Sequence, residues 1–565
     1  MGSHLLPWRY LDLRKILAVV SAAVLSTTLL AAGTDARVYY VDSRRGNDSA
    51  PGTKTEPFKS ITRASKLAEP GDKVLIGTGI YHEQIIGGKS GLEGSPITYE
   101  GADRSKVILQ GSVLVKEWQR RGNVWVHSGL RPITPENAFV MVDEKRMLRR
   151  VPSTANMPGG SFHLGADGTN TIRLQDGAHP NRNHVVEVYE LDFAFNSGDR
   201  WNGTAKSWIV LRNMTLEKYG GHGISTDSKH PADNSHWVLD SLIVRYNRAE
   251  GVFHCLDDWY VHDCTFMRNG VHGCQLDGAR IQFVNNLCTE NEWFGPSGNG
   301  GCGILIGPDE SAHSCEIRDN VFSDNGVPNG YGCGIYLEGR SHDNLIEDNL
   351  IIGGTSSGIG FFGSSYNKVI NNVLVNVAPT TDSDQAAAFV VNHSFEGAPT
   401  QSVGNLVAHN TICGCPAPLA VMRPKGIVKS TDLNRFVNNL FADCRHLSPV
   451  PESPPIRLEA NGFFSCPEKS GGNKEGLSRW LSALSGNESI ERLGNVVGDD
   501  AGFQNPAAGD FHLRHGSPAI RAGVPLSELT LDKDHNLRPR GRRPTLGAYE
   551  YLSAAGRASK RSVSP

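Results

Sequence analysis

Two carboxylates and a glycine end three successive repeat segments of this chain. The segments are GCQLD (273–277), GILIG (303–307) and GIYLE (334–338), which end in Asp277, Gly307 and Glu338. If each segment is a strand, alternation sends Asp277 and Glu338 to the outer face, and Gly307 leaves a slot between them. Neighbouring strands lie about 4.8 Å apart, so the two backbones are roughly 9–10 Å apart. Carboxyl groups across such a slot could act as acid and base on a glycosidic bond.

Polar and aromatic residues beside the slot are candidate substrate contacts. Strand alternation places Gln275 and Tyr336 on the same outer face, and further candidates come from the flanking turns and loops: His272, Trp293, Asp309 and Arg340. An aromatic side chain beside carboxylates can stack on the face of a sugar. The side chains can reach the separation of an inverting or of a retaining pair, so both mechanisms stay open.

The three segments belong to a repeat that extends through residues 203–447. An apolar stub ends in Asn or Asp and leads to a short Gly-Ile-type segment, and the stub ends at Asp240, Asp263, Asn285, Asp319, Asp348, Asn371 and Asn438. Up to Asn371 these positions are 22 to 34 residues apart. Repeats of this length cannot bury an apolar face alone and must stack. The Asn/Asp column fits a ladder of stacked side chains at one turn, where left-handed backbone is tolerated.

The composition of each repeat selects the type of solenoid. Short Val, Ile, Leu and Phe runs alternate with turn residues, and no stretch is long enough for two helices per repeat. Strands of neighbouring coils must therefore pair in parallel. The sequence predicts an all-β fold, a right-handed parallel β-helix with a small inserted antiparallel β-domain.

Composition and charge limit the partners and the compartment. The 565 residues are 39% hydrophobic with 63 glycines and 30 prolines, which suits a long core between many turns. A net charge of −3 argues against nucleic acid or an anionic membrane as partner. Arg9, Arg14 and Lys15 precede the apolar run 16–32, which predicts a signal peptide, with a signal anchor as the alternative. We expect a secreted or periplasmic monomer without a membrane span after cleavage.

The cysteines predict a reduced core rather than a metal site. The chain has 11 cysteines, and several of those in the repeats fall at inward strand positions. No Cys-x-x-Cys pairs recur at zinc spacing, so we expect no metal centre of the sulfur type. Buried thiols are the favoured interpretation. A disulfide among Cys413, Cys415 and Cys444 is the alternative.

Pattern and composition divide the chain into seven parts. We expect a signal peptide at 1–36, a cap with the first coils at 37–114, an inserted β-domain at 115–202, β-helix repeats at 203–447, a linker or excursion at 448–498, a closing segment at 499–554 and a disordered tail at 555–565. Amphipathic patterns predict short helices near 60–68 and 478–484.

Three segments resemble known secreted β-helix proteins. The stretch 38–85, with YYVD, GNDS, PFKSI and PGDKVLIGTGIYHE, resembles the opening of many secreted carbohydrate-active β-helix proteins. The alternating stretch 115–202 resembles the β-domain inserted into β-helical glycoside hydrolases, notably the xylosidase and fucosidase group. The stretch 499–551 looks like the terminal segment of many such proteins. The resemblance implies a pectate-lyase-like solenoid and a hydrolase that acts on a polysaccharide or oligosaccharide without a cofactor.

The chain departs from the hydrolase pattern at one position. GIYLE resembles a GIWLD-type strand of the xylosidase-like relatives, which implies that Glu338 takes the place of the first acid. The next coil, GIGFF, offers Phe362 where the second acid is expected. The departure puts a retaining mechanism of that type in doubt and leaves an inverting pair that uses Asp277.

Two other functions compete with hydrolysis. A polysaccharide lyase would remove a proton from a uronic acid, with a basic side chain and Ca²⁺ or a cationic side chain at the carboxylate. The residues available for such a site are Asp227, Asp257, Asp258 and Asp277, with Lys229, Arg280 or Arg340 as base. The third possibility is a β-helix that binds glycans without catalysis, because the predicted site depends on two carboxylates and their strand register.

Overall fold

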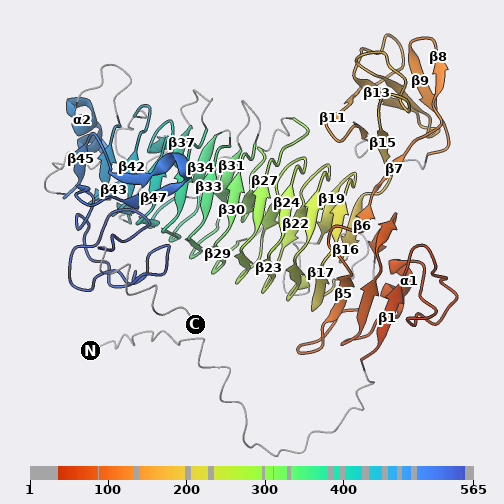
Figure 1. Cartoon of the computed structure of the whole chain (residues 1–565), viewed down its shortest axis with the longest axis horizontal. Coiled ribbons are helices and arrows are strands. Elements are labelled where there is room, and N and C mark those ends of the chain that lie inside the picture. The colour runs from red at the N-terminus through yellow and green to blue at the C-terminus, as the bar shows by residue number, and fades with distance from the viewer. Residues whose placement is uncertain are drawn as a thin grey trace, which may run out of the picture. The chain divides into compact units, whose positions relative to one another are not determined.

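The chain forms a right-handed parallel β-helix, as the repeats predict. The structure is a computed structural model that describes residues 36–86, 88–130, 139–197, 205–226, 234–295, 300–308, 311–326, 332–354, 356–378, 386–392, 401–422, 432–447, 456–466, 474–484 and 493–553. The predicted signal peptide and disordered tail lie outside these residues, apart from Ala36. Three long sheets, here named A, B and C, consist of parallel neighbours, and Figure 1 shows the strands of successive coils following one another.

From β16 to β42, each coil contributes one strand to each sheet, in the order C, A, B. Sheet A contains β1 (Val38–Val41), β2 (Lys73–Ile76), β5 (Ile97–Gly101), β17 (Ile209–Arg212), β20 (Val238–Asp240), β23 (Tyr260–His262), β26 (Gln282–Val284), β29 (Glu316–Arg318), β32 (Leu345–Glu347), β35 (Lys368–Ile370), β38 (Leu406–Ala408), β41 (Asn434–Val437) and β43 (Ile456–Glu459). Sheet B contains β3 (Gly79–Tyr81), β6 (Val107–Gln110), β18 (Thr215–Glu217), β21 (Ile243–Arg245), β24 (Thr265–Met267), β27 (Leu287–Thr289), β30 (Val321–Ser323), β33 (Leu350–Ile352), β36 (Val373–Val375), β39 (Thr411–Cys413), β42 (Leu440–Ala442), β44 (Gly462–Phe464) and β45 (Val496–Gly498). Sheet C contains β4 (Ile85–Ile86), β16 (Phe193–Asn196), β19 (His222–Ser225), β22 (Val252–Cys255), β25 (Cys274–Leu276), β28 (Ile304–Ile306), β31 (Cys333–Glu338), β34 (Ser357–Phe362), β37 (Ala387–Asn392) and β40 (Leu419–Met422).

Asparagine ladders hold the corners between the sheets. At the corner from A to B the ladder consists of Asn286, Asn320, Asn349, Asn372, Asn410, Asn439, Asn461 and Asn495. Each side-chain amide donates to the Oδ1 of the next coil's asparagine, and that same Oδ1 also accepts a backbone N–H. The ladders therefore satisfy buried polar groups that the tight corners would otherwise leave without partners.

The predicted Asn/Asp column lies one residue before the ladder. Asp263, Asn285, Asp319 and Asp348 have φ between 54° and 58°, which is the left-handed region that Asn and Asp tolerate. Asp240 does not belong to this column, because it pairs with His262 at the end of a strand and its neighbour Ser241 takes the left-handed position. The prediction thus found the corner but assigned the stacking to the wrong residue.

Apolar side chains and thiols fill the interior of the coils. Sheet C contributes a continuous inward row, Cys274, Leu276, Ile304, Ile306, Ile335 and Leu337, each fully buried. All 11 cysteines lie in the described part of the chain, where they are buried free thiols. The structure therefore supports the buried-thiol interpretation over a disulfide among Cys413, Cys415 and Cys444.

A separate antiparallel β-domain interrupts the coils. Its sheets contain β7 (Ser112–Leu114), β10 (Val140–Val142), β11 (Arg146–Met147) and β15 (Val186–Tyr189), and β8 (Gln119–Arg121), β9 (Val124–His127), β12 (Arg149–Arg150), β13 (Ser161–Leu164) and β14 (Asn170–Arg173). The insertion thus begins and ends earlier than the predicted 115–202. Buried Lys218 in the coils donates to Glu144 and Glu187 of the domain at 2.6 and 2.8 Å, which fixes the junction.

Two helices cover the ends of the core, and a closing segment packs on the outer face of sheet B. Helix α1 (Ile61–Leu67) begins at Ser60, whose side chain accepts from the Arg63 N–H, and helix α2 (Lys474–Leu484) packs Leu477 and Leu481 on the last coils. The closing segment contains β46 (Phe503–Asn505), the 3₁₀ turn η4 (Pro506–Ala508) and β47 (Asp510–Leu513). Residues 448–498 were predicted as a linker or excursion, and this was wrong, because β43, β44 and β45 continue the sheets there.

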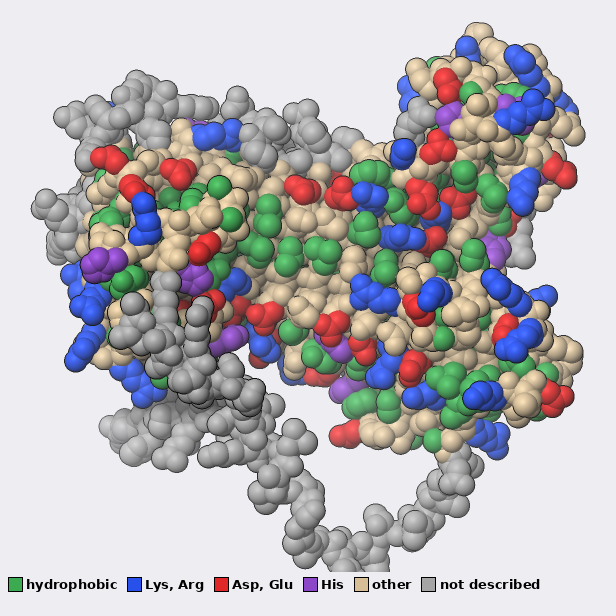
Figure 2. All heavy atoms as spheres, viewed as in Figure 1, with side chains coloured by type: hydrophobic (Ala, Val, Ile, Leu, Met, Phe, Trp, Pro, Cys, Tyr) green, Lys and Arg blue, Asp and Glu red, His purple; other side chains and the backbone are tan. Residues whose placement is uncertain are grey.

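The described surface carries mixed charges. On the face seen in Figure 2, acidic and basic side chains are interspersed along the coils rather than gathered by sign. Among the described residues, no helix has the length and apolar character needed to cross a membrane.

Candidate active site

Asp277, Gly307 and Glu338 lie in one column on the outer face of sheet C. Leu276 pairs with Ile306 and Ile306 with Leu337, so the residues that follow them are in register across β25, β28 and β31. The next coil places Phe362 beside Glu338. The strand register therefore places two acidic residues, two rungs apart, on either side of a glycine.

Both carboxylates are buried although they face away from the core. Asp277 is 1% exposed and Glu338 is 8% exposed, so neither is the solvated surface group that an outward strand position usually holds. Burying a carboxylate is costly unless hydrogen bonds or opposite charges compensate. Asp277 has such compensation from two neighbours.

The neighbours of Asp277 are His254 and Gln275. The Nδ1 atom of His254 lies 2.6 Å from Asp277 Oδ2, and the side-chain amide of Gln275 donates to the same oxygen at 2.9 Å. All three side chains are buried, with at most 4% of each residue exposed. Gln275 was predicted to contact substrate, and the structure places it directly on the Asp277 carboxylate.

His254 reaches Asp277 because β22 contains a β-bulge. Val252 pairs with Cys274 and Cys255 pairs with Leu276, so β22 has one more residue between the paired positions than β25. His254 takes up the extra residue with φ of 61°. Regular alternation from Gly251 would place Cys255 on the outer face with Asp277, but the bulge places it in the core. The bulge turns the side chain of a strand residue toward the neighbouring coil.

The sequence contains a weak signal for this bulge. In GCQLD the inward residues follow the glycine by one and three positions, whereas in GVFHC they follow it by one and four positions. A strand with regular alternation cannot place both Val252 and Cys255 inward. His254 was not predicted as a site residue because the segments were aligned without a gap.

A second buried polar group lies at the beginning of the same strands. Glu250 Oε2 is 2.8 Å from His222 Nδ1. Burial opposes ionisation of Glu250, but the hydrogen bond and the charge of His222 lower the pKa of that carboxyl to about 2. The Glu250 carboxylate is therefore a fixed negative charge on this face.

His272, a predicted substrate contact, is part of this second group. Its Nδ1 accepts the backbone N–H of Cys302 at 3.1 Å, and the ring is buried. Burial lowers the pKa of His272, while the carboxylates of Glu250, Glu292 and Asp277 act in the opposite direction. The ring is thus held as the neutral tautomer with its proton on Nε2.

An aromatic pair closes the side of the column beyond Glu338. The ring of Tyr336 stacks on that of Phe362, with centroids 4.2 Å apart and planes 14° from parallel. A Cβ at Gly360 would lie 2.5 Å from the Phe362 ring, so glycine is required beneath it. Tyr336 remains partly exposed, as a sugar-stacking residue must be.

The remaining predicted contacts have different surroundings. Trp293 is half-buried, with the Arg268 guanidinium 4.7 Å from its ring centroid, and it packs against the apolar cluster of Met141, Tyr189 and Tyr246. Arg340 is exposed just after the left-handed Gly339. Asp309 lies outside the described residues.

Among the residues that the structure describes, the acidic cluster proposed for a lyase does not assemble around Asp277. Arg280 binds Asp258 at 2.7 Å and Asp257 at 3.4 Å, which makes an ion-pair group at the turn from sheet C to sheet A. Asp277 instead binds His254 on the face of sheet C. Asp227 and Lys229 lie outside the described residues.

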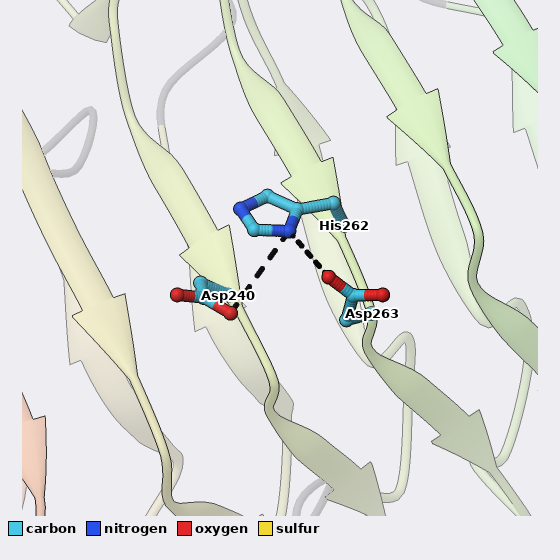
Figure 3. Close-up of side chains that lie close together, drawn as sticks. All are labelled: Asp240, His262 and Asp263. Carbon is cyan, nitrogen blue, oxygen red and sulfur yellow. Dashed lines mark hydrogen bonds and ion pairs between the residues drawn. The ribbon is translucent and has the colours of Figure 1, made fainter. Parts of the chain in front are cut away.

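A further group of possible metal ligands lies on sheet A. Figure 3 shows Asp240 and Asp263 on either side of His262, whose Nδ1 is 2.8 Å from Asp263 and 3.9 Å from Asp240. Among the described residues these three are the set with donor atoms close enough to hold one ion. The Asp263 side chain is 47% exposed and Asp240 also accepts from Ser241, so the group resembles an ordinary solvated surface cluster.

Comparison with known proteins supports the fold. A family described as "Right handed beta helix region" matches residues 250–441, and one described as "Protein of unknown function (DUF1565)" matches residues 44–89. The chain contains a right-handed β-helix. The uncharacterized protein YwoF of Bacillus subtilis (strain 168) is 33% identical over 107 residues, which is 18% of this chain and 23% of that protein.

Among solved structures, one has a similar fold at low sequence identity. The structure described as the complex of XylC with xylose has a TM-score of 0.62 at 14% identity and covers 91% of this chain and 98% of its own. Pectate lyase Pel9A, also 14% identical, has a TM-score of 0.44 over 92% of this chain and 98% of its own. At these identities the likeness concerns the fold alone.

Proposed function

We propose that this protein is an exported carbohydrate-active enzyme, and that it is a glycoside hydrolase with Asp277 and Glu338 as its catalytic carboxylates. The observation that carries the proposal is the column of two buried carboxylates across Gly307, because a glycosidase needs two carboxyl groups that face one bond.

The surroundings of the column suit a sugar. Tyr336, stacked on Phe362, provides an apolar surface beside the carboxylates on which a pyranose ring can stack. The exposed Arg340 follows the same strand and is proposed as a hydrogen-bond donor to substrate hydroxyl groups. The proposed partner is a polysaccharide or an oligosaccharide, bound by a monomer.

The fold comparison is compatible with the proposal. The protein named XylC was solved with xylose, so a sugar ligand is known for a β-helix of closely similar architecture. Its low identity transfers no residue roles, and the proposal for this chain therefore depends on its own side chains. The proposed hydrolysis uses carboxylates and water.

A polysaccharide lyase is the second candidate because of the pair His254 and Asp277. A buried imidazole 2.6 Å from a carboxylate is an arrangement that can take a proton, as removal of the proton beside a uronic acid carboxylate requires. In that case a cation such as Ca²⁺ or a basic side chain would neutralise the substrate carboxylate.

One assay separates the two reactions. The mature protein, purified without residues 1–36, is incubated with xylan, polygalacturonate and alginate, with and without EDTA, and two products are recorded. New reducing ends without ultraviolet absorbance of an unsaturated sugar indicate hydrolysis. New absorbance on a uronic-acid polymer indicates elimination and would refute the hydrolase.

Variants then locate the reaction. Asp277→Asn and Glu338→Gln remove one ionisable group each with little change in shape, so each is expected to abolish hydrolysis while the protein stays folded. Asp263→Asn, on the outer face of sheet A, is the matched control for an acidic residue on another face. Full activity of both Asp277→Asn and Glu338→Gln would refute the site.

A further inference from the structure

The bulge in β22 directs the imidazole of His254 toward Asp277 in the neighbouring coil. His254 is 3% exposed and has φ of 61°. A left-handed residue inside a strand, unlike one at a corner, interrupts the pairing and costs free energy. In this stack of coils the left-handed Asn and Asp residues occupy corners, where they end a strand. The position of His254 is therefore one that the surrounding structure must impose.

Two hydrogen-bond donors meet at a single oxygen, and the bulge supplies one of them. His254 Nδ1 and Gln275 Nε2 approach Asp277 Oδ2 to 2.6 and 2.9 Å. Hydrogen bonds to the charged form of a carboxylate favour that form, and two donors on one oxygen also fix the rotation of the carboxyl group. Titratable groups near these residues include His222, Glu250, His272 and Glu292.

The rings of His254, Phe253 and His222 form a packed row. Phe253 lies 3.7 Å from His254 and 4.4 Å from His222, measured between ring centroids, and it stacks on His222 within 14° of parallel. His222 in turn contacts Glu250. The imidazole of His254 is thus held in place on one side by packed rings and on the other by the carboxylate, which limits its motion.

We propose that His254 is a positioning residue that, together with Gln275, holds Asp277 as the ionised carboxylate of the catalytic pair. Asp277 is then the base and Glu338 the acid. This inference rests on the proposed hydrolase function and assigns the roles within it. The bulge is not a general property of the fold, because β25, β28 and β31 of the same sheet keep regular pairing at this position.

The roles define how the proton and the electrons move. Asp277 takes a proton from a water molecule while the oxygen of that water forms a bond to the anomeric carbon. The bond from that carbon to the leaving oxygen breaks, and the leaving oxygen takes the proton of Glu338. Because this is a single displacement by water on the face opposite the leaving group, the product has inverted configuration at the anomeric carbon.

Two variants of His254 test the positioning role. In His254→Gly, glycine adopts a φ of 61° without strain, but the hydrogen-bond donor is lost. In His254→Asn, asparagine tolerates the same φ and offers an amide N–H close to the position of Nδ1. We expect His254→Gly to lose about 10–100-fold in kcat, since misplacing a catalytic group has effects of that size. His254→Asn is expected to recover at least tenfold relative to His254→Gly.

Thermal unfolding distinguishes positioning from folding. Both variants are expected to unfold at similar temperatures, because both accept the backbone conformation of the bulge. A residue with a purely structural role would give parallel losses of stability and activity and no specific rescue by asparagine. If His254→Asn is as inactive as His254→Gly, or if His254→Gly keeps wild-type kcat, the positioning role is refuted.

The leaving group tests the assignment of acid and base. The probe is the 2,4-dinitrophenyl glycoside of whichever sugar the wild-type protein releases from polysaccharide. Its leaving group needs no proton, so Glu338→Gln is expected to recover about 10²-fold or more on it relative to the natural substrate, whereas Asp277→Asn is not. The opposite pattern would reverse the roles. If neither variant loses activity on either substrate, the hydrolase proposal itself is refuted. Failure of the role assignment and failure of the hydrolase proposal therefore give different results.

Discussion

Two regions of the coils use buried polar side chains in opposite ways. At the corner from sheet A to sheet B, one residue type repeats from coil to coil, and each Asn side chain bonds to the equivalent Asn of its neighbour. On the outer face of sheet C the residue changes at every coil, from Asp277 to Gly307 to Glu338 to Phe362. The first region is periodic, and the second is not.

The difference separates structural from functional polarity in a solenoid. A side chain that stacks on its own copy serves every coil equally, so its bonds stabilise the repeat. A polar residue that appears once cannot serve the repeat, and its burial must be supported locally, as His254 and Gln275 support Asp277. In a stack of repeats, loss of periodicity therefore marks a candidate site.

The largest expected effect is on activity and comes from the non-periodic region. Asp277→Asn or Glu338→Gln is expected to lower kcat by about 10²–10⁴-fold, because each removes a general acid or base. The unfolding midpoint in urea should stay near that of the wild type. An equal loss of stability and activity would show that the buried pair is structural, and would remove the contrast between the two regions.

The next effect is on stability and comes from the ladder. Asn349 is fully buried and bonds to Asn320, Asn372 and the carbonyl oxygen of Ile317. Asn349→Ala leaves these partners unsatisfied, so the free energy of unfolding is expected to fall by about 2–4 kcal/mol. Urea unfolding measures the loss. Asp319→Asn, at the exposed left-handed position of the neighbouring coil, is the control and should change little.

A smaller, pH-dependent effect is expected in the left-handed column beside the ladder. Burial, with the charge of Glu347, raises the pKa of Asp348 from its ordinary 3.8 to about 8, although Lys533 acts against it. Because the folded-state pKa lies above the unfolded value, the stabilising contribution of the protonated form is present below pH 4 and is lost as pH rises toward 8.

The variant Asp348→Asn tests this dependence. Asparagine suits the position, because Asn371 and Asn438 occupy the same left-handed column in other coils. The variant cannot ionise, so it is expected to be more stable than the wild type by about 1–3 kcal/mol above pH 8 and equally stable near pH 4. Urea unfolding across that pH range gives the difference. A constant difference at all pH values would contradict the titration of Asp348.

The smallest effect is expected for the exposed cluster on sheet A. Asp263→Asn removes a carboxylate whose side chain is 47% exposed and bonds to His262. The next coil has Asn285 at the same left-handed position, so we expect a change in unfolding free energy below about 0.5 kcal/mol and in activity below about twofold. A large loss of activity would move the candidate site from sheet C to sheet A.

The sequence allowed the fold and the column of the site to be predicted because both follow from repetition. Gly-Ile-type segments and Asn/Asp positions recur often enough to define a coil, and alternation then decides which residues face outward. The final coils were missed although Asn461 and Asn495 follow the preceding ladder members by 22 and 34 residues, because Pro-, Ser- and Gly-rich segments precede each of them.

Other features of the site could not be obtained from alternation. The bulge at His254 adds one residue to one strand, and an alignment of five-residue segments without gaps cannot show it. The burial of Asp277 and Glu338 also escaped prediction. Strand periodicity assigns a side chain to a face of the sheet, but it does not say what covers that face.

The asparagine ladders also have a direction. At each of the three corners, the side-chain N–H of one coil's asparagine points to the side-chain oxygen of the asparagine in the next coil toward the C-terminus. Examples are Asn247 to Asn269 at the corner from B to C, Asn286 to Asn320 from A to B, and Asn344 to Asn367 from C to A. The side-chain dipoles are therefore aligned head to tail along the coils, with their positive ends toward the C-terminal coils. Aligned peptide groups give an α-helix its macrodipole in the same way, and bonds in such a row polarise one another. The β-helix thus carries a lengthwise electric polarity that is built from side chains.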